Sequence, residues 1–313
     1  MANLELRCAA QTLARHIDPI GTAPVYDAYV LVEVPLPWPA AITDHVLLAG
    51  VVAAAEAAPP RATVLGLVPD HDEPDRHRVV VYRRPPGPFR RFQRSERVVA
   101  PDELAAATGQ LLAAPLAPDE PPAEDGSWDL LICTHGRRDR CCGSYGMNLF
   151  TAVGVSHARA GVRTWRVSHT GGHRFAPTAI LLPEGSLWAW LDPDIVDTVI
   201  HRRGDASDVL DHYRGSSAVG PPAAQVAERE AFRLEGWAWL DAHRSATVVS
   251  SDGDQAEVRV HAERPDGSVV AYAASVDRIG TAPQPVCGEL LTGEGNGKSD
   301  SIWSLTRFER VDP

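Results

Sequence analysis

Residues 128–143, Trp-Asp-Leu-Leu-Ile-Cys-Thr-His-Gly-Arg-Arg-Asp-Arg-Cys-Cys-Gly, place a cysteine-rich loop directly after a short apolar run. The apolar run, Trp128 to Ile132, predicts a buried strand, and the loop leads into a helix over Met147 to Ala160. We expect the unit to continue with a strand, a hairpin of two strands and an amphipathic helix, over residues 164–168, 179–182, 187–191 and 194–203. We interpret this order of elements as that of a thioredoxin-like unit.

The first hundred residues also predict an α/β unit. The apolar residues Ala28 to Glu33 predict a buried strand, and the chain must then leave the sheet at Pro35 to Pro39, because proline cannot donate to a ladder. We expect a helix, two strands and a second helix to follow, over residues 43–57, 62–68, 78–82 and 101–112. This half has no candidate ligands, so we interpret it as a degenerate thioredoxin-like half.

The remaining segments separate and follow these units. Residues 114–127 are dense in proline and acidic side chains, which is typical of a linker or surface crossing. Downstream we expect a long helix and three alternating strands, over residues 222–241, 246–250, 257–262 and 268–273, as a small β-rich C-terminal appendage. The sequence therefore predicts an α/β protein with three parts, residues 1–113, 114–220 and 221–313.

Composition restricts the classes of partner and the compartment. The 313 residues carry 30 basic and 41 acidic side chains, a net charge of −11, which opposes non-specific attraction to nucleic acid or an anionic membrane. The longest apolar run, Val46 to Ala55, is too short to cross about 30 Å of hydrocarbon. Met1 to Cys8 has no basic segment followed by an apolar one. We expect a cytoplasmic protein with no nucleic-acid or membrane partner, and the odd number of cysteines, five, argues against a disulfide framework.

Four side chains in the quoted loop and beyond it have metal-ligand chemistry. Cys133 and Cys142 have eight residues between them, and His169 and His173 have three. The glycine pair between the histidines disfavours a helix, because each glycine costs about 1 kcal/mol in a helix interior. A tight turn that brings the two rings together is expected instead. The set offers two thiolates and two imidazoles to one centre.

The residues alone leave two kinds of centre open. A single zinc ion accepts two cysteines and two histidines, but structural zinc usually takes its cysteines from a turn with about two to four intervening residues. A [2Fe–2S] cluster needs four ligands, and Rieske centres use two imidazoles in place of two thiolates. The Rieske motif mixes one cysteine and one histidine in each segment, whereas here the two kinds are segregated. A Rieske fold is therefore disfavoured, but a cluster is not.

The same residues carry a family resemblance. The chain resembles the sucrase/ferredoxin-like family in two spacings, Cys133-x8-Cys142 and His169-x3-His173. It also shares with that family the sequences Thr-His-Gly-Arg-Arg-Asp and Gly-Gly-His-Arg-Phe-Ala-Pro-Thr. The resemblance also includes residues 29–38, the sequence Tyr-Arg-Gly at 213–215 and the late Cys-Gly at 287–288. It implies a thioredoxin-like ferredoxin domain over residues 114–220 and a bishistidinyl, non-Rieske [2Fe–2S] cluster on the four candidate ligands. Other thioredoxin-like ferredoxins have Cys-x3-Cys where this chain has the two histidines. No pair of carboxylates stands out as a glycosidase site, so the "sucrase" in the family name has no support.

Such ligation has consequences for the cluster. Two ferric ions, two sulfides, two thiolates and two neutral imidazoles sum to a charge of about zero, whereas four thiolates give about −2. The less negative cluster accepts an electron more readily. Each ligating imidazole also has a second nitrogen whose proton affinity rises on reduction, so the potential is expected to depend on pH.

Basic residues and further cysteines surround the candidate ligands. Residues 133–174 contain seven arginines and one acid, a net charge of +6, which is suited to steering an acidic redox partner or to donating hydrogen bonds to cluster sulfurs. The candidates for such contacts are Arg137, Arg138, Arg140, Cys141 and Arg174. Cys141 is expected to be a packing residue, with a spare ligand or a vicinal disulfide as alternatives, and Cys8 and Cys287 are expected to be free thiols.

The sequence therefore predicts an electron-transfer protein, an electron carrier rather than a catalyst with its own substrate. No glycine-rich dinucleotide fingerprint appears, so the reductase is expected to be a separate protein. Two alternatives remain. Zinc on the same four residues would make a structural or binding protein. Thiol–disulfide exchange would use Cys133, Cys141 or Cys142, although the Cys-x2-Cys motif that lowers a thiol pKa is absent.

Overall fold

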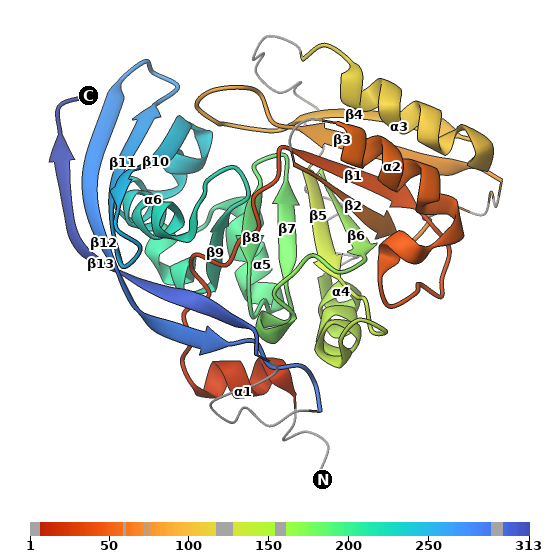
Figure 1. The fold of residues 1–313 in the computed structure, drawn as a ribbon, viewed down its shortest axis with the longest axis horizontal. Coiled ribbons are helices and arrows are strands. Elements are labelled where there is room, and N and C mark those ends of the chain that lie inside the picture. Colours follow the sequence, from red (N-terminus) through yellow and green to blue (C-terminus); the bar gives the residue numbers. More distant parts are fainter. Residues whose placement is uncertain are drawn as a thin grey trace.

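The structure, a computed structural model, describes residues 7–58, 61–71, 73, 75–116, 128–153, 161–288 and 297–313. Within these ranges a nine-stranded mixed sheet runs through the middle of the molecule, and a four-stranded antiparallel sheet lies at one side (Figure 1). The strands of the large sheet are, in spatial order, β4 (Gln93–Val99), β3 (His77–Arg83), β1 (Ala28–Glu33), β2 (Ala62–Leu67), β6 (Val162–Val167), β5 (Trp128–Cys133), β7 (Ala179–Leu182), β8 (Ser186–Trp188) and β9 (Tyr213–Ser216).

The large sheet consists of two similar units placed edge to edge. In the first, β1 and β2 are parallel and are connected through α2 (Ala49–Ala57); β3 then pairs antiparallel with β1, and β4 antiparallel with β3, before α3 (Leu104–Ala113). In the second, β5 and β6 are parallel and are connected through α4 (Met147–Val153); β7 pairs antiparallel with β5, and β8 antiparallel with β7, before α5 (Pro193–His201). Both units have the order β-α-β-β-β-α. The second unit contains the elements that the sequence predicts, the first contains the unpredicted strand β4 as well, and the mixed α/β class is confirmed.

The two units meet at the carboxyl ends of β2 and β6. Leu67 pairs with Val167 across an antiparallel bridge, the single ladder pair between these two strands in the described part of the chain. Ser168 extends the contact, since its amide donates to the Gly66 carbonyl at 2.8 Å and its Oγ accepts from the Gly66 amide at 3.0 Å. One continuous sheet therefore contains strands from both of the first two predicted parts, 1–113 and 114–220. The boundaries between the three parts remain a prediction.

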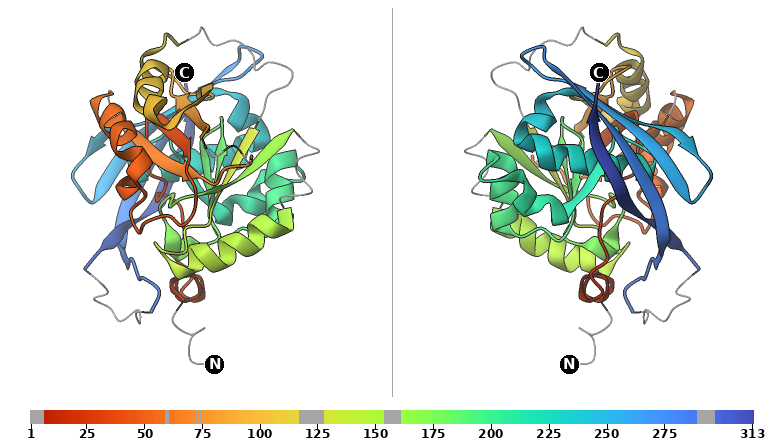
Figure 2. Two further views of the ribbon diagram at one scale, coloured as in Figure 1. Left: turned by 90° about the vertical axis from the view of Figure 1, so that its right-hand side faces the viewer. Right: turned by 90° about the vertical axis from the view of Figure 1, so that its left-hand side faces the viewer.

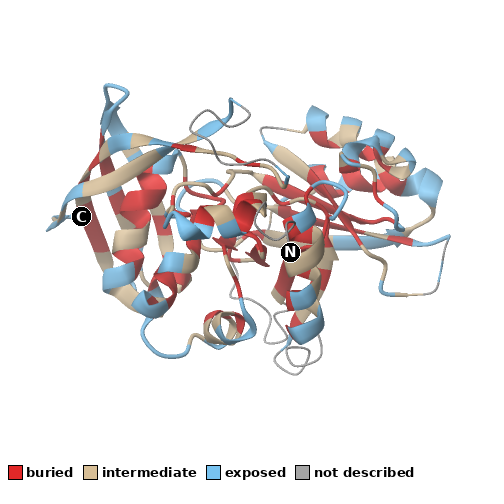
Figure 3. Ribbon diagram, turned by 90° about the horizontal axis from the view of Figure 1, so that it is seen from below, coloured by how far each residue is buried: buried red, intermediate tan, exposed pale blue. Residues whose placement is uncertain are grey.

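Alternating side chains give the sheet two apolar faces. In β1, Val30 and Val32 face the layer of α2 and α3, whereas Tyr29 and Leu31 face a second cluster that also contains residues of β5, β6 and β7. A third cluster packs the second unit against α4 and α5. Figure 3 shows the strands buried in the interior and the helices exposing their outer faces. The core therefore positions the ends of β5 and β6 rigidly.

The C-terminal region packs one helix against the small sheet. Helix α6 (Pro222–Glu235) contacts β9 of the large sheet and all four strands of the small one. These strands are β10 (His243–Ser251), β11 (Gln255–Glu263), β12 (Val269–Pro283) and β13 (Ser299–Val311). The long strands β12 and β13 extend towards the end of the molecule that holds α1 (Cys8–Ala14), as Figures 1 and 2 show. The predicted β-rich appendage is confirmed.

Several predicted elements differ from the observed ones. The helix predicted over 43–57 is two short 3-10 turns followed by α2, and the helix predicted over 222–241 ends at Glu235. Gly236, with a φ of +64°, stops that helix. The elements α1, β4, β9 and β13 are absent from the sequence prediction. Most of the linker at 114–127 and the end of the helix predicted over 147–160 lie outside the described residues.

No described helix combines the length and apolar character that a bilayer crossing requires.

Candidate metal centre

Three of the four predicted ligands come together at the carboxyl edge of the second unit. Cys133 is the last residue of β5, Cys142 begins a π-helical turn that leads into α4, and His169 lies two residues after β6. Because β5 and β6 are parallel neighbours, their carboxyl ends lie at the same edge of the sheet. One ligand atom from each of the three residues lies within 4.8 Å of the others. Two thiols and one imidazole could therefore bind one metal centre.

Glycines allow the cysteine loop to fold this closely. A Cβ atom at Gly146 would lie 2.0 Å from the carbonyl oxygen of Cys133, and one at Gly143 would lie 2.5 Å from the Cα atom of Gly136. Any side chain at Gly146 would push the start of α4 away from the end of β5. The glycines therefore bring Cys142 towards Cys133.

The histidine segment is a tight turn, as its glycine pair predicts. Gly171 and Gly172 have φ values of +82° and +71°, the left-handed region that glycine adopts without strain. The fully buried guanidinium of Arg214 lies under this turn, where it donates to the carbonyls of Gly171 at 3.2 Å and Thr22 at 2.7 Å. Burial lowers the pKa of Arg214 to about 10. A Cβ at Gly172 would lie 2.5 Å from this guanidinium, so the turn and the arginine fit only with glycine there.

His173 lies beside the group of three rather than within it. Its ring centroid is 5.8 Å from that of His169. Its Nδ1 lies 3.1 Å from Oδ2 of Asp139 and 3.4 Å from Sγ of Cys8. The side chain is 18% exposed, and with Arg174, Arg214 and Asp300 it lines a small polar pocket. The structure thus brings Cys133, Cys142 and His169 together, and His173 lies next to His169.

The donors of the group are buried and incompletely partnered. The side chains of Cys133 and Cys142 have no solvent exposure. The Cys142 hydrogen bond and the nearby His169 ring hold the pKa of the Cys133 thiol well below its usual value. The same hydrogen bond, together with burial, raises the pKa of Cys142. Nδ1 of His169 is buried without a hydrogen-bond partner among the described residues. Buried thiols and an unpartnered imidazole nitrogen are the donor set of a metal site.

The first unit contributes a wall to the site. Nε2 of His135 is 2.8 Å from the carbonyl of Pro39, and the His135 ring lies edge-on to Trp38 with centroids 5.4 Å apart. The proline-rich segment that leaves β1 therefore covers the cysteine loop.

The predicted surrounding residues have different positions. Arg137, Arg138 and Arg140 are exposed on the loop between the two cysteines. Arg174 is buried and directs its guanidinium to Asp300 at 2.7 Å and to the Pro283 carbonyl at 3.3 Å. Of the seven arginines counted in this region, Arg159 lies outside the described residues.

Sequence reasoning missed a second cluster of cysteines. The five cysteines are free thiols, as expected for Cys8 and Cys287, and Cys141 forms no vicinal disulfide. The Sγ atoms of Cys8, Cys141 and Cys287 nevertheless lie close together beside Asp139. No signal in the sequence links these three positions, because their proximity depends on α1 and on the end of β12. Arg214 belongs to the Tyr-Arg-Gly sequence at 213–215, and that pattern does not predict its position under the histidine turn.

Comparisons with known proteins place the chain in a family. No curated protein and no solved structure matches it. A family model, described as sucrase/ferredoxin-like, matches residues 19–215, from the segment before β1 to β9. The match includes the four predicted ligands but ends well before Cys287, so the resemblance predicted for residues 287–288 is not part of it. Since the match covers more than half of the sequence and contains both units of the large sheet, the chain belongs to the sucrase/ferredoxin-like family.

Proposed function

We propose that the protein transfers electrons through a [2Fe–2S] cluster held by Cys133, Cys142, His169 and His173. The observation that carries this proposal is the group of two buried thiols and one half-buried imidazole at the carboxyl edge of β5 and β6, with His173 next to it. The donor set fits such a cluster, because thiolates and imidazoles are its established ligands in proteins.

The separation of His173 from the other three ligands favours a two-metal centre over a single ion. A single tetrahedral ion needs all four donor atoms around one point, whereas two irons distribute their ligands over a longer distance. The cysteine pair would bind one iron and the histidine pair the other. Nδ1 of His173 faces Asp139, which leaves Nε2 as its ligand nitrogen. A carboxylate that accepts a hydrogen bond from the second nitrogen is the usual partner of a metal-bound histidine.

When bound, the cluster would supply one-electron oxidation and reduction. The protein's own residues determine how charge reaches and leaves it. His173 is 18% exposed and opens to the polar pocket beside Arg174 and Asp300, so its ring gives protons a route to the site. The neutral imidazoles keep the total charge less negative than four thiolates would. Electron uptake is therefore coupled to proton uptake, with a potential that rises as the pH falls.

The electron donor or acceptor is a separate protein in this proposal. Arg137, Arg138 and Arg140 are exposed on the loop that joins the two cysteine ligands. Three positive charges so close to the site favour docking of an acidic surface. We place the reaction in the cytoplasm.

The visible spectrum of protein purified without oxygen tests the proposal, before and after dithionite, with iron, sulfide and zinc measured on the same sample. The expected result is a red-brown protein with two irons and two sulfides per chain whose colour bleaches on reduction. His169→Ala and His173→Ala should each lose the iron and the colour. A colourless protein whose only metal is zinc bound to these four residues would refute electron transfer and establish the zinc alternative.

Thiol–disulfide exchange is the weaker alternative. Cys133, Cys141 and Cys142 have no solvent exposure, so a substrate disulfide has no access to them in this conformation. A metal-free protein after anaerobic reconstitution, with exchange activity that survives His169→Ala, would support this alternative.

A further inference from the structure

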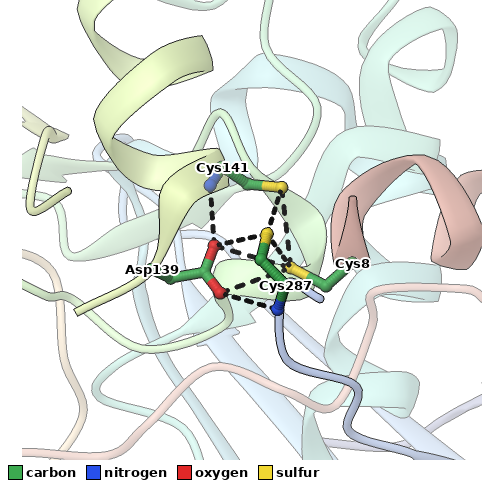
Figure 4. A group of neighbouring side chains, drawn as sticks. All are labelled: Cys8, Asp139, Cys141 and Cys287. Carbon is green, nitrogen blue, oxygen red and sulfur yellow. Dashed lines mark hydrogen bonds between the residues drawn. The ribbon is translucent and has the colours of Figure 1, made fainter. Parts of the chain in front are cut away.

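Three cysteines that are far apart in the sequence converge at a second place, outside the proposed cluster ligands. Cys8 comes from α1, Cys141 from the end of the ligand loop, and Cys287 from the segment after β12. The Sγ atom of Cys8 is 3.6 Å from that of Cys141 and 3.6 Å from that of Cys287, and the last two are 3.1 Å apart. Figure 4 shows the three sulfur atoms pointing towards one another.

A carboxylate completes the cluster. Oδ1 of Asp139 lies 3.3 Å from Sγ of Cys287 and 3.5 Å from Sγ of Cys8. The carboxylate is held by two backbone amides, that of Cys141 at 2.8 Å and that of Cys287 at 3.4 Å. Its orientation towards the sulfurs is therefore set by the backbone, as the dashed lines in Figure 4 indicate.

These separations match a tetrahedral metal site. Bonds of about 2.3 Å to sulfur at tetrahedral angles require sulfur atoms about 3.8 Å apart, and an oxygen ligand at about 2.0 Å lies about 3.5 Å from each sulfur. Two of the three sulfur pairs, at 3.6 Å, lie within a few tenths of an ångström of this distance, and both sulfur–oxygen distances, 3.5 and 3.3 Å, are similarly close. The closer pair, Cys141 and Cys287, would separate slightly on binding.

Burial and charge favour a cation at this point. Cys8 and Cys141 have no solvent exposure, and Asp139 is 5% exposed. A buried carboxylate surrounded by three thiols is costly unless a positive charge is close to it. The ring of His173 lies beside Asp139, but its other nitrogen is assigned to the cluster. A divalent ion would neutralise the carboxylate and bind the three sulfurs as thiolates.

We propose that Cys8, Cys141, Cys287 and Asp139 form a second metal site, which takes a single thiophilic divalent cation of the zinc class. Only half of the site lies within the family match, since Asp139 and Cys141 fall inside residues 19–215 and Cys8 and Cys287 fall outside them. It joins α1 and the end of β12 to the ligand loop, across sequence separations of 131 and 148 residues from Asp139. Asp139 also contacts His173, so the bound ion holds in place a residue next to the proposed cluster.

Metal analysis of matched cysteine variants tests this proposal. The wild-type chain is expected to bind one zinc ion. Cys287→Ser, at a half-buried position, should lose the zinc and keep the iron and sulfide of the proposed cluster. Cys133→Ser should lose the iron and keep the zinc. This opposite pattern distinguishes the two sites, and a wild-type protein with zinc but no iron would refute only the proposed function.

Cobalt gives a second readout that does not depend on the stability of Cys287→Ser. Co²⁺ is added to a cluster-free variant, Cys133→Ser or, if that variant does not fold, His169→Ala. Thiolate-to-cobalt charge transfer and the strong visible bands of tetrahedral Co²⁺ are expected, and zinc should abolish them. A chain that binds neither zinc nor cobalt here overturns the proposal, as does retention of the zinc in Cys287→Ser. A Cys141–Cys287 disulfide in protein purified without oxygen, detected by mass after thiol alkylation, also overturns it.

Discussion

Gly146 controls how closely the two cysteine ligands approach each other. The residue lies at the end of the π-helical turn that Cys142 begins, and its Cα faces the backbone of Cys133. A methyl group there would meet the Cys133 carbonyl oxygen at 2.0 Å, a distance that only movement of the backbone can relieve. The geometry of the proposed site thus depends on the absence of a side chain.

We predict that Gly146→Ala destabilises the protein by about 1–3 kcal/mol, the usual cost of overpacking, and reduces its iron content. Urea unfolding and the visible absorbance per chain measure the two effects. Gly109→Ala is the matched control, because Gly109 lies inside α3 with no heavy atom within 4 Å of the added methyl group. This control should gain up to about 1 kcal/mol in helix stability. Equal behaviour of the two variants would contradict the prediction.

Histidine ligation is tested by the double variant His169→Cys/His173→Cys. Two more thiolates make the cluster more negative, so its potential should fall by on the order of 100 mV or more. In the wild-type protein the potential should decrease as the pH rises, by up to about 59 mV per pH unit for one proton per electron. The double variant should lose this dependence. Voltammetry over a range of pH checks both points, and a wild-type potential that does not change with pH would refute proton coupling through the imidazoles.

At the scale of elements, strand β9 supports the histidine turn through Arg214. The sequence predicts most strands closely, because runs such as Ala28–Glu33 are apolar except at their last residue and become buried on both faces. It misses β4 and β13, whose side chains are mostly exposed or half-buried and alternate poorly. It also misses the contact between β9 and the turn after β6, because these segments are far apart in the chain.

Replacing Arg214 with methionine should leave the carbonyls of Gly171 and Thr22 without their donors. We expect a loss of about 3 kcal/mol in stability, since each unsatisfied buried group costs about 1–3 kcal/mol. The iron should also be released faster to a chelator, because the turn that carries both histidines loses its support. Arg203→Met is the control: Arg203 is 64% exposed and pairs with Asp197 at the surface, so a change within about 0.5 kcal/mol is expected. An unchanged rate of iron release in Arg214→Met would show that the turn keeps its conformation without this arginine.

At the scale of the whole molecule, Asp129 connects the two units of the large sheet. Its carboxylate is 1% exposed and lies on β5. From the second unit it accepts hydrogen bonds from Arg163 at 2.8 Å and Trp165 at 2.9 Å. From the first it accepts one from Arg94 at 3.3 Å and one from the hydroxyl of Tyr82. Burial, together with this carboxylate, raises the pKa of Tyr82, so the phenol remains a donor.

Asp129→Ala is expected to destabilise the protein by about 3–5 kcal/mol, because it leaves buried donors and a guanidinium without their acceptor. Urea unfolding followed by tryptophan fluorescence measures the loss. Glu309→Ala, which removes a surface partner of Arg307 on β13, should change the stability by less than about 0.5 kcal/mol. A loss of less than about 1 kcal/mol in Asp129→Ala would mean that the two units are joined mainly by their apolar cluster.

The sequence by itself determined the α/β class, most of the order of strands and helices in the two units, and the three side chains Cys133, Cys142 and His169 that the structure brings together. These follow from local patterns: apolar runs, glycine pairs and the short spacing of ligands along the chain. Only the tertiary structure decided the edge-to-edge joining of β2 and β6, the role of Arg214 and the meeting of Cys8, Cys141 and Cys287. Each of these depends on contacts between segments that are distant in the chain. Such contacts arise from the packing of whole elements, which a linear pattern of residues does not encode.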